Sequence, residues 1–75
     1  MSIASVVVEI QNGANEGVMA HLARIPKVTV YGVTKNQIVT VIEGDSPAAV
    51  EHILKEVQDL ENVLGVYPVY VGEDD

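Results

Sequence analysis

Residues 46–60, SPAAVEHILKEVQDL, carry the clearest helix signal in the chain. Ser46 is a favourable N-cap because its hydroxyl accepts a hydrogen bond from a first-turn amide, and Pro47 already has the φ that the first helical position needs. The apolar residues recur at i, i+3, i+4, i+7 and i+10, which puts them on one helix face. They are Val50, Ile53, Leu54, Val57 and Leu60. The stretch therefore predicts an amphipathic helix that packs on an apolar surface.

The segments around this helix are rich in β-branched residues, which is typical of strands. Four strands are predicted: residues 3–10 (IASVVVEI), 28–33 (VTVYGV), 38–43 (IVTVIE) and 63–71 (VLGVYPVYV). A second helix is expected over residues 14–25, where Val18, Leu22 and Ile25 have helical spacing and Pro26 ends the pattern. The element order is then β-α-β-β-α-β.

Two halves of similar pattern support this order. Residues 22–31 (LARIPKVTVY) echo residues 57–67 (VQDLENVLGVY), with one residue inserted. Two β-α-β units with right-handed crossovers predict an α+β fold, the ferredoxin-like sandwich, with a four-stranded antiparallel sheet in the order 4-1-3-2 and both helices on one face. Pro68 cannot donate a hydrogen bond, which suits an edge strand. The 75 residues are expected to form one domain, with a frayed acidic tail at residues 72–75.

The sheet face that the helices leave bare is predicted to be apolar. Strand alternation assigns side chains to it, and for residues 38–43, where the pattern alone is ambiguous, the shared parity of Glu43 with two valines favours those three pointing outward. The predicted outward residues are Ser5, Val7, Glu9, Thr29, Tyr31, Val33, Val39, Val41, Glu43, Tyr67, Val69 and Val71. An apolar surface of this extent is usually covered, and the sequence leaves open whether a partner peptide or a second copy covers it.

The charge balance bears on the partner. Eleven acidic and four basic residues give a net charge of −7, which repels phosphate backbones and disfavours nucleic acid. A basic peptide suits this charge, although net charge also simply keeps a small domain in solution. The N-terminal segment has no basic region and carries Glu9 in its apolar run, so neither a signal peptide nor a membrane span is expected. The expected location is the cytoplasm.

No pattern for catalysis or metal binding is present. The chain has no cysteine, which excludes disulfides, iron–sulfur clusters and thiolate zinc sites. His21 and His52 lack the spacing of a metal motif and are expected to be surface residues, while Ser5 and Ser46 have no base at a recognisable spacing. The sequence therefore predicts a binding module with no metal and no cofactor rather than an enzyme.

Four segments of the chain, residues 3–8, 22–26, 38–43 and 61–70, resemble those of one known family, the NapD-type chaperones of the periplasmic nitrate reductase. Residues 3–8 (IASVVV) resemble the opening strand of that family, residues 22–26 (LARIP) its first helix end, and residues 38–43 (IVTVIE) its third strand. Residues 61–70 (ENVLGVYPVY) are similar to its Gly-Val-Leu…Val-Tyr ending. Asn62 stands where the family usually has Gly, and Val71 stands where a polar residue, often His, follows the Val-Tyr pair.

This resemblance implies a function that fits the bare face. A NapD-type chaperone binds the twin-arginine signal peptide of the nitrate reductase catalytic subunit and restrains export until the molybdenum cofactor is inserted. The family uses its sheet face for the peptide, which makes the outward residues above the expected peptide-binding residues. The alternative is a small ligand-sensing or self-associating effector domain of the amino-acid-regulator type, which shares this topology.

Overall fold

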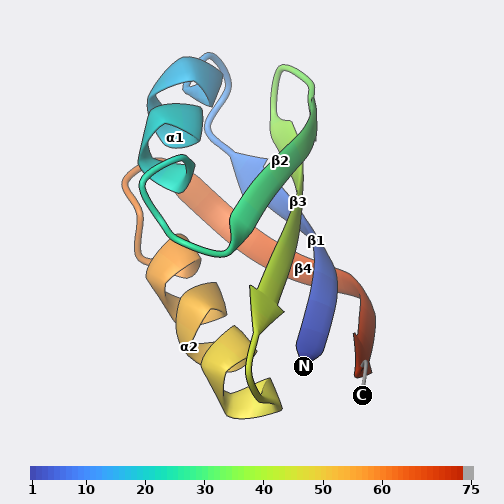
Figure 1. Ribbon diagram of the computed structural model, residues 1–75. Coiled ribbons are helices and arrows are strands. Elements are labelled where there is room, and N and C mark those ends of the chain that lie inside the picture. The colour runs from blue at the N-terminus through green and yellow to red at the C-terminus, as the bar shows by residue number, and fades with distance from the viewer. Residues whose placement is uncertain (74–75) are drawn as a thin grey trace.

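A computed structural model describes residues 1–73 of the chain. The elements follow in the order β1 (Ser2–Ile10), α1 (Asn15–Leu22), β2 (Val28–Val33), β3 (Gln37–Gly44), α2 (Pro47–Gln58) and β4 (Val63–Glu73) (Figure 1). The four strands form one sheet in the order β2-β3-β1-β4, and every neighbouring pair is antiparallel. The predicted ferredoxin-like topology is confirmed, and β4 lies at an edge as Pro68 indicated.

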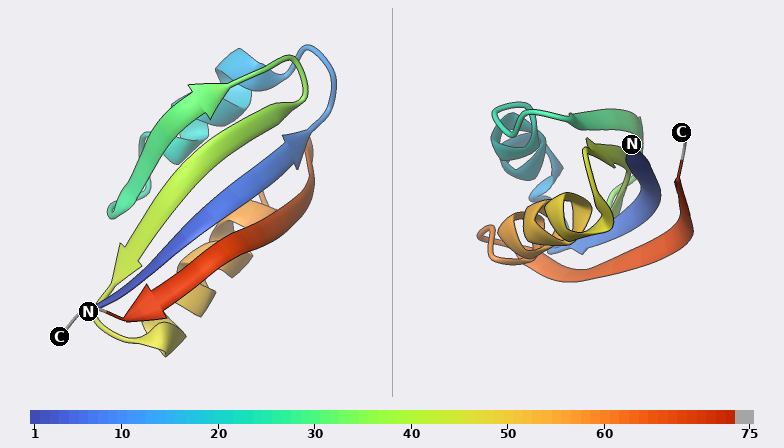
Figure 2. Two further views of the ribbon diagram at one scale, coloured as in Figure 1. Left: turned by 90° about the vertical axis from the view of Figure 1, so that its right-hand side faces the viewer. Right: turned by 60° about the horizontal axis from the view of Figure 1, so that its bottom comes forward.

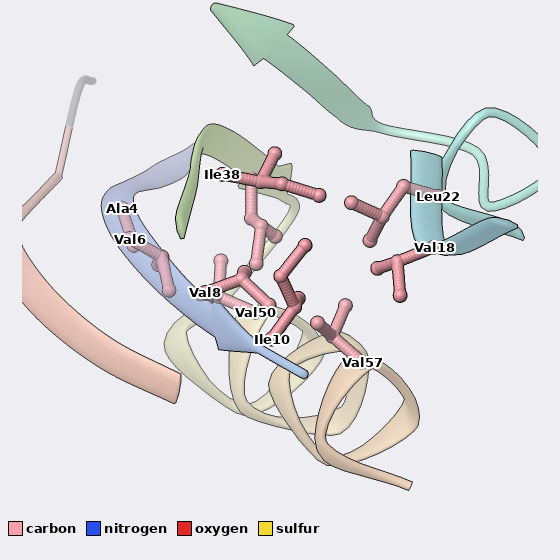
Figure 3. Packing of buried hydrophobic residues seen from close by; sticks show 10 residues of the cluster. Ala4, Val6, Val8, Ile10, Val18, Leu22, Ile38, Val50 and Val57 are labelled. Atoms are coloured by element: carbon pink, nitrogen blue, oxygen red, sulfur yellow. The ribbon is translucent and has the colours of Figure 1, made fainter. Parts of the chain in front are cut away.

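Both helices cover the same face of the sheet, and the core lies between the two layers (Figure 2). Every second residue of β1 contributes to this core, together with residues from β3 and from the apolar face of each helix (Figure 3). The buried apolar residues are Ala4, Val6, Val8, Ile10, Val18, Leu22, Ile38, Ile42, Val50 and Val57. The core is thin because aliphatic side chains of moderate size fill it.

The second helix begins as predicted. The Ser46 hydroxyl accepts a hydrogen bond from the Ala49 amide at 3.2 Å, and Pro47 is the first helical residue. Val50 and Val57 are buried, and the other members of the predicted stripe are partly buried against the same core. The apolar stripe therefore faces the sheet, and Leu60 packs against the core from the turn after α2, which ends at Gln58.

The first helix is shorter than predicted, because it ends at Leu22 and not at residue 25. The Arg24 and Ile25 amides donate to the carbonyls of residues three positions earlier, His21 and Leu22, at 3.1 Å each. Such bonds tighten the last turn, and Pro26 disfavours a helical conformation for Ile25. Ile25 still packs against the core, so its apolar spacing reflects a capping turn and not a further helical turn.

The two helix-to-strand junctions have the same backbone geometry. Lys27 before β2 and Asn62 before β4 both adopt a left-handed conformation, with φ of 73° and 70°. The amide of the next residue donates to the carbonyl three positions earlier in each case, at 3.4 Å for Val28 and 3.2 Å for Val63. Asn tolerates this conformation better than other non-glycine residues do, which suits Asn62 to this junction.

The last strand extends further than predicted. Gly72 pairs with Ile3 and Glu73 pairs with Ser2, so these two residues belong to β4 and not to a frayed tail. Asp74 and Asp75 lie outside the described residues. The pairing brings the start of β1 beside the end of β4 (Figure 2). Among residues 1–73 no helix has the length and apolar character that a membrane crossing requires.

Candidate functional site

The sheet surface opposite the helices is the candidate site, and we call it the open face; the left view of Figure 2 looks onto it. In β1 and β3 the alternation is regular, and residues on the helix side are buried while those on the open face are partly or fully exposed. Thr40 is buried on the helix side, where its hydroxyl donates to the Val6 carbonyl at 3.3 Å. The predicted outward placement is confirmed for Ser5, Val7, Glu9, Val39, Val41 and Glu43.

Register shifts in β4 change the expected placement of its side chains. Tyr67 pairs with Val7 on the open face, as predicted. An extra residue, Val69, then interrupts the pairing, so that Tyr70 lies opposite Ser5 on the open face and Val71 pairs with the buried Ala4 on the helix side. The outward prediction for Val71 is therefore wrong, and Tyr70 was missed. Pro68, next to the bulge, was the available signal, because proline within a sheet occurs at edges and bulges.

Val71 lies in a different environment from the two tyrosines. It lines a shallow apolar pocket with residues from the start of β1 and from α2. The other lining residues are Ser2, Pro47, Val50, Glu51 and Leu54. Val71 therefore belongs to the helix layer and not to the open face.

A register shift in β2 has a similar effect. Thr29 pairs with Val41 on the open face, but the shift between Val30 and Gly32 places Val33 opposite the buried Ile38. Val33 is therefore on the helix side, contrary to the prediction. Tyr31 lies at the bulge and is 71% exposed, so it stands at the margin of the open face. One extra residue in a strand moves the side chains of all later residues of that strand to the opposite face of the sheet.

Four cross-strand rows define the open face. The two central rows hold most of its apolar and aromatic side chains, and the two outer rows each hold one carboxylate. From one end to the other the rows are Gly65–Glu9–Gln37, Tyr67–Val7–Val39–Gly32, Tyr70–Ser5–Val41–Thr29 and Gly72–Ile3–Glu43. The face therefore has an apolar centre between two acidic ends.

The two tyrosines of β4 lie over glycines in the outer rows. A Cβ at Gly65 would lie 2.5 Å from the Tyr67 hydroxyl, and a Cβ at Gly72 would lie 2.5 Å from the Tyr70 hydroxyl. The ring of Tyr67 therefore extends toward the row of Glu9, and that of Tyr70 extends the opposite way. Both side chains remain more than half exposed, so one surface of each ring is free for contact.

The predicted surface histidines are both exposed on the helices. His52 Nε2 lies 3.3 Å from Glu56 Oε1 one turn along α2, and His21 lies in the last turn of α1. Within residues 1–73 no three His, Asp or Glu side chains are grouped as metal ligands would be.

The open face offers aliphatic, aromatic and carboxylate contacts, which suit binding of an apolar and basic segment.

Comparison with known proteins assigns the chain to a family. A family model described as NapD protein matches residues 1–75. The chain belongs to the NapD family. This confirms the resemblance to the NapD-type chaperones, and it makes this NapD-family chain a chaperone and not an enzyme.

The NapD fold is also found in a solved structure. The solution structure of the E. coli Tat proofreading chaperone protein NapD superposes with a TM-score of 0.86 at 21% identity. The match covers 97% of this chain and 79% of the E. coli chain. No curated protein sequence matched the chain.

Proposed function

We propose that this chain is a cytoplasmic chaperone that binds the twin-arginine signal peptide of a periplasmic nitrate reductase catalytic subunit on its open face. Binding holds the client back from export until the molybdenum cofactor is inserted. The observation that carries the proposal is the apolar and aromatic open face of a NapD-family chain, with exposed Tyr67, Val69 and Tyr70 on β4. A solved structure of the same fold bears the description Tat proofreading chaperone.

The apolar part of a signal peptide provides the affinity in this proposal. At ~25 cal/mol per Å2, burial of roughly 300 Å2 of apolar surface on the central rows contributes about 7 kcal/mol before the costs of binding. Ordering a flexible peptide offsets part of that gain. The net affinity is therefore lower than the burial of apolar surface alone would give.

The carboxylates govern orientation more than strength. Glu9 and Glu43 are both on the open face and both partly exposed, so each ion pair with a client arginine contributes only about 0–1 kcal/mol. The net charge of −7 raises the rate of encounter with a basic peptide. Higher salt is therefore expected to slow association while it weakens the complex only modestly.

Two charge substitutions on the open face test the proposal. Val7→Glu and Tyr67→Glu each place an unpaired carboxylate inside the apolar contact, and each is expected to abolish binding of a synthetic twin-arginine signal peptide in titration calorimetry. Gln58→Glu adds the same charge to the exposed surface of α2 and is the matched control. Circular dichroism checks that all three variants fold. Full affinity in both face variants would place the site elsewhere.

Restraint of export is a separate step and needs its own measurement. A reporter protein that carries the nitrate reductase signal peptide is expected to reach the periplasm more slowly when the chaperone is co-produced. The Tyr67→Glu variant is expected to leave export at its basal rate. If the reporter is exported equally fast with the wild-type chaperone and without it, the proposed restraint of export is refuted. The proposed binding of the peptide would not be affected by that result.

A second copy of the chain is the competing occupant of the open face. Light scattering with and without the peptide distinguishes the two cases. A monomer that takes up one peptide supports the proposal, whereas a dimer that the peptide does not dissociate would assign the open face to self-association.

A further inference from the structure

The two acidic ends of the open face differ in how their carboxylate lies relative to a tyrosine ring. At one end Glu9 pairs directly with Gly65, the glycine that the Tyr67 ring covers. Adjacent strands lie about 4.8 Å apart, so the Tyr67 ring lies over the residue directly beside Glu9. At the other end Ile3 stands between Glu43 and Gly72, and the strand spacing sets those two residues about 10 Å apart.

We propose that the corner formed by Glu9 and Tyr67 is the seat of one guanidinium group of the client's arginine pair. The inference rests on the proposed function and identifies the residues that contact the arginine side chain. In this corner a planar cation stacks on the free surface of the Tyr67 ring while its N–H groups donate to the Glu9 carboxylate. The Glu43 end provides no such combination in one place.

One lysine of the chain lies near each end of the open face. Lys27 lies opposite Glu43, since the Glu43 amide donates to the Lys27 carbonyl at 2.9 Å. The backbone of Lys27, immediately before β2, therefore lies beside Glu43 at this end of the sheet. Next to the corner the cross-strand neighbour of Glu9 is the uncharged Gln37. Lys35 lies beyond it, at the exposed tip of the β2–β3 hairpin that Thr34 and Gln37 close with a 2.8 Å bond.

The two carboxylates cannot share one arginine pair without strain on the peptide. Six residues of β1 separate Glu9 from Ile3, the partner of Glu43, and at about 3.3 Å per residue the carboxylate rows are about 20 Å apart. Neighbouring Cα atoms of a peptide are about 3.8 Å apart, so contact with both ends requires the two arginines to splay in opposite directions. A single seat at the Glu9 end avoids this splaying of the arginines. It also fixes the direction in which the client peptide lies along the open face.

The polarity follows from the rows beyond the corner. With the arginines at the row of Glu9, the apolar part of the signal peptide lies over Val7 and Val39 and continues toward Tyr70 and Val41. Binding in the reverse direction would bring the arginines to the Glu43 end, where no tyrosine ring lies next to the carboxylate row. The open face therefore selects one of the two directions along β1.

Matched pairs of variants test the seat against the same synthetic twin-arginine peptide. Glu9→Gln is expected to weaken binding about threefold to fivefold, and Glu43→Gln less than twofold. Tyr67→Leu is expected to make the affinities for the twin-arginine peptide and its twin-lysine analogue nearly equal. The ring favours arginine because lysine lacks a planar group that can stack on it. Tyr70→Leu is expected to preserve the preference for arginine. A larger loss in Glu43→Gln than in Glu9→Gln would overturn the seat.

A spin label on the arginine end of the peptide locates the seat in the unmodified chaperone. The label is expected to broaden the amide signals of Gln11 and Gln37 and to spare those of Gly44 and Asp45. Broadening of the second pair alone would refute the proposed polarity while leaving peptide binding established. No binding of the wild-type chain to either peptide would instead refute the proposed function, and with it the seat.

Discussion

Replacement of Leu22 by alanine tests the core directly. Leu22 is fully buried between the first helix and the sheet, and the change removes three carbon atoms. At about 0.8 kcal/mol per methylene the transfer loss is about 2.4 kcal/mol, and the cavity that remains brings the expected cost to about 3–5 kcal/mol. A domain of 75 residues has a free energy of unfolding of about 4–11 kcal/mol, so the variant is expected to lose a large part of its stability.

Leu64 provides a matched control for the same chemical change. Its side chain is 59% exposed on β4, and Leu64→Ala is expected to change stability by less than about 0.5 kcal/mol. Urea unfolding followed by circular dichroism measures the free energy of unfolding of both variants. In thermal unfolding, a loss of 3 kcal/mol in Leu22→Ala is expected to lower Tm by about 12–24 °C. If Leu22→Ala does not fold, Ile42→Val, also fully buried, is expected to cost about 0.5–1.5 kcal/mol. Equal stability of the two leucine variants would show that α1 is misplaced.

Three further substitutions address local features. Ser46→Ala removes the side chain that caps α2 and is expected to lower the free energy of unfolding by about 1 kcal/mol in the same urea assay. Asn62→Gly is expected to keep or slightly raise stability, whereas Asn62→Val is expected to lose about 1–2 kcal/mol, because φ is 70° there; the opposite ranking would contradict the left-handed junction. Gly65→Ala is expected to displace the Tyr67 ring, seen as chemical-shift changes of that ring and weaker peptide binding, while a variant with an unmoved ring would argue against the close approach.

Residues of the regular elements were predictable because their patterns are local. The stripe of α2 and its Ser46 cap were both correct, since spacing and capping depend on a few neighbouring residues. Parity also placed the residues of β1 and β3 on the correct faces, and Glu43 correctly indicated the exposed side of its strand. The strand order followed from the element order and from Pro68. The buried layer could thus be predicted from the sequence alone.

The edges of the sheet were predicted less well, because bulges leave only a weak signal in a sequence. Val33 and Val71 were assigned to the wrong face, and Tyr70 was missed, since one extra residue in β2 or β4 reverses the alternation. The carboxylates Glu9 and Glu43 were correctly placed on one face, but their separation follows from antiparallel pairing. Each lies near the C-terminal end of its strand, so antiparallel neighbours carry them to opposite ends.

The adjacent ends of β1 and β4 determine how a client could be tethered to this chaperone. Ser2 and Glu73 pair at one pole of the molecule, and seven residues of β1 carry the chain about 23 Å from there to Glu9. A flexible linker of roughly 20 residues has a matching root-mean-square length. A signal peptide fused through such a linker would therefore meet the open face at a high effective concentration, and a much shorter linker would force it to bind another molecule.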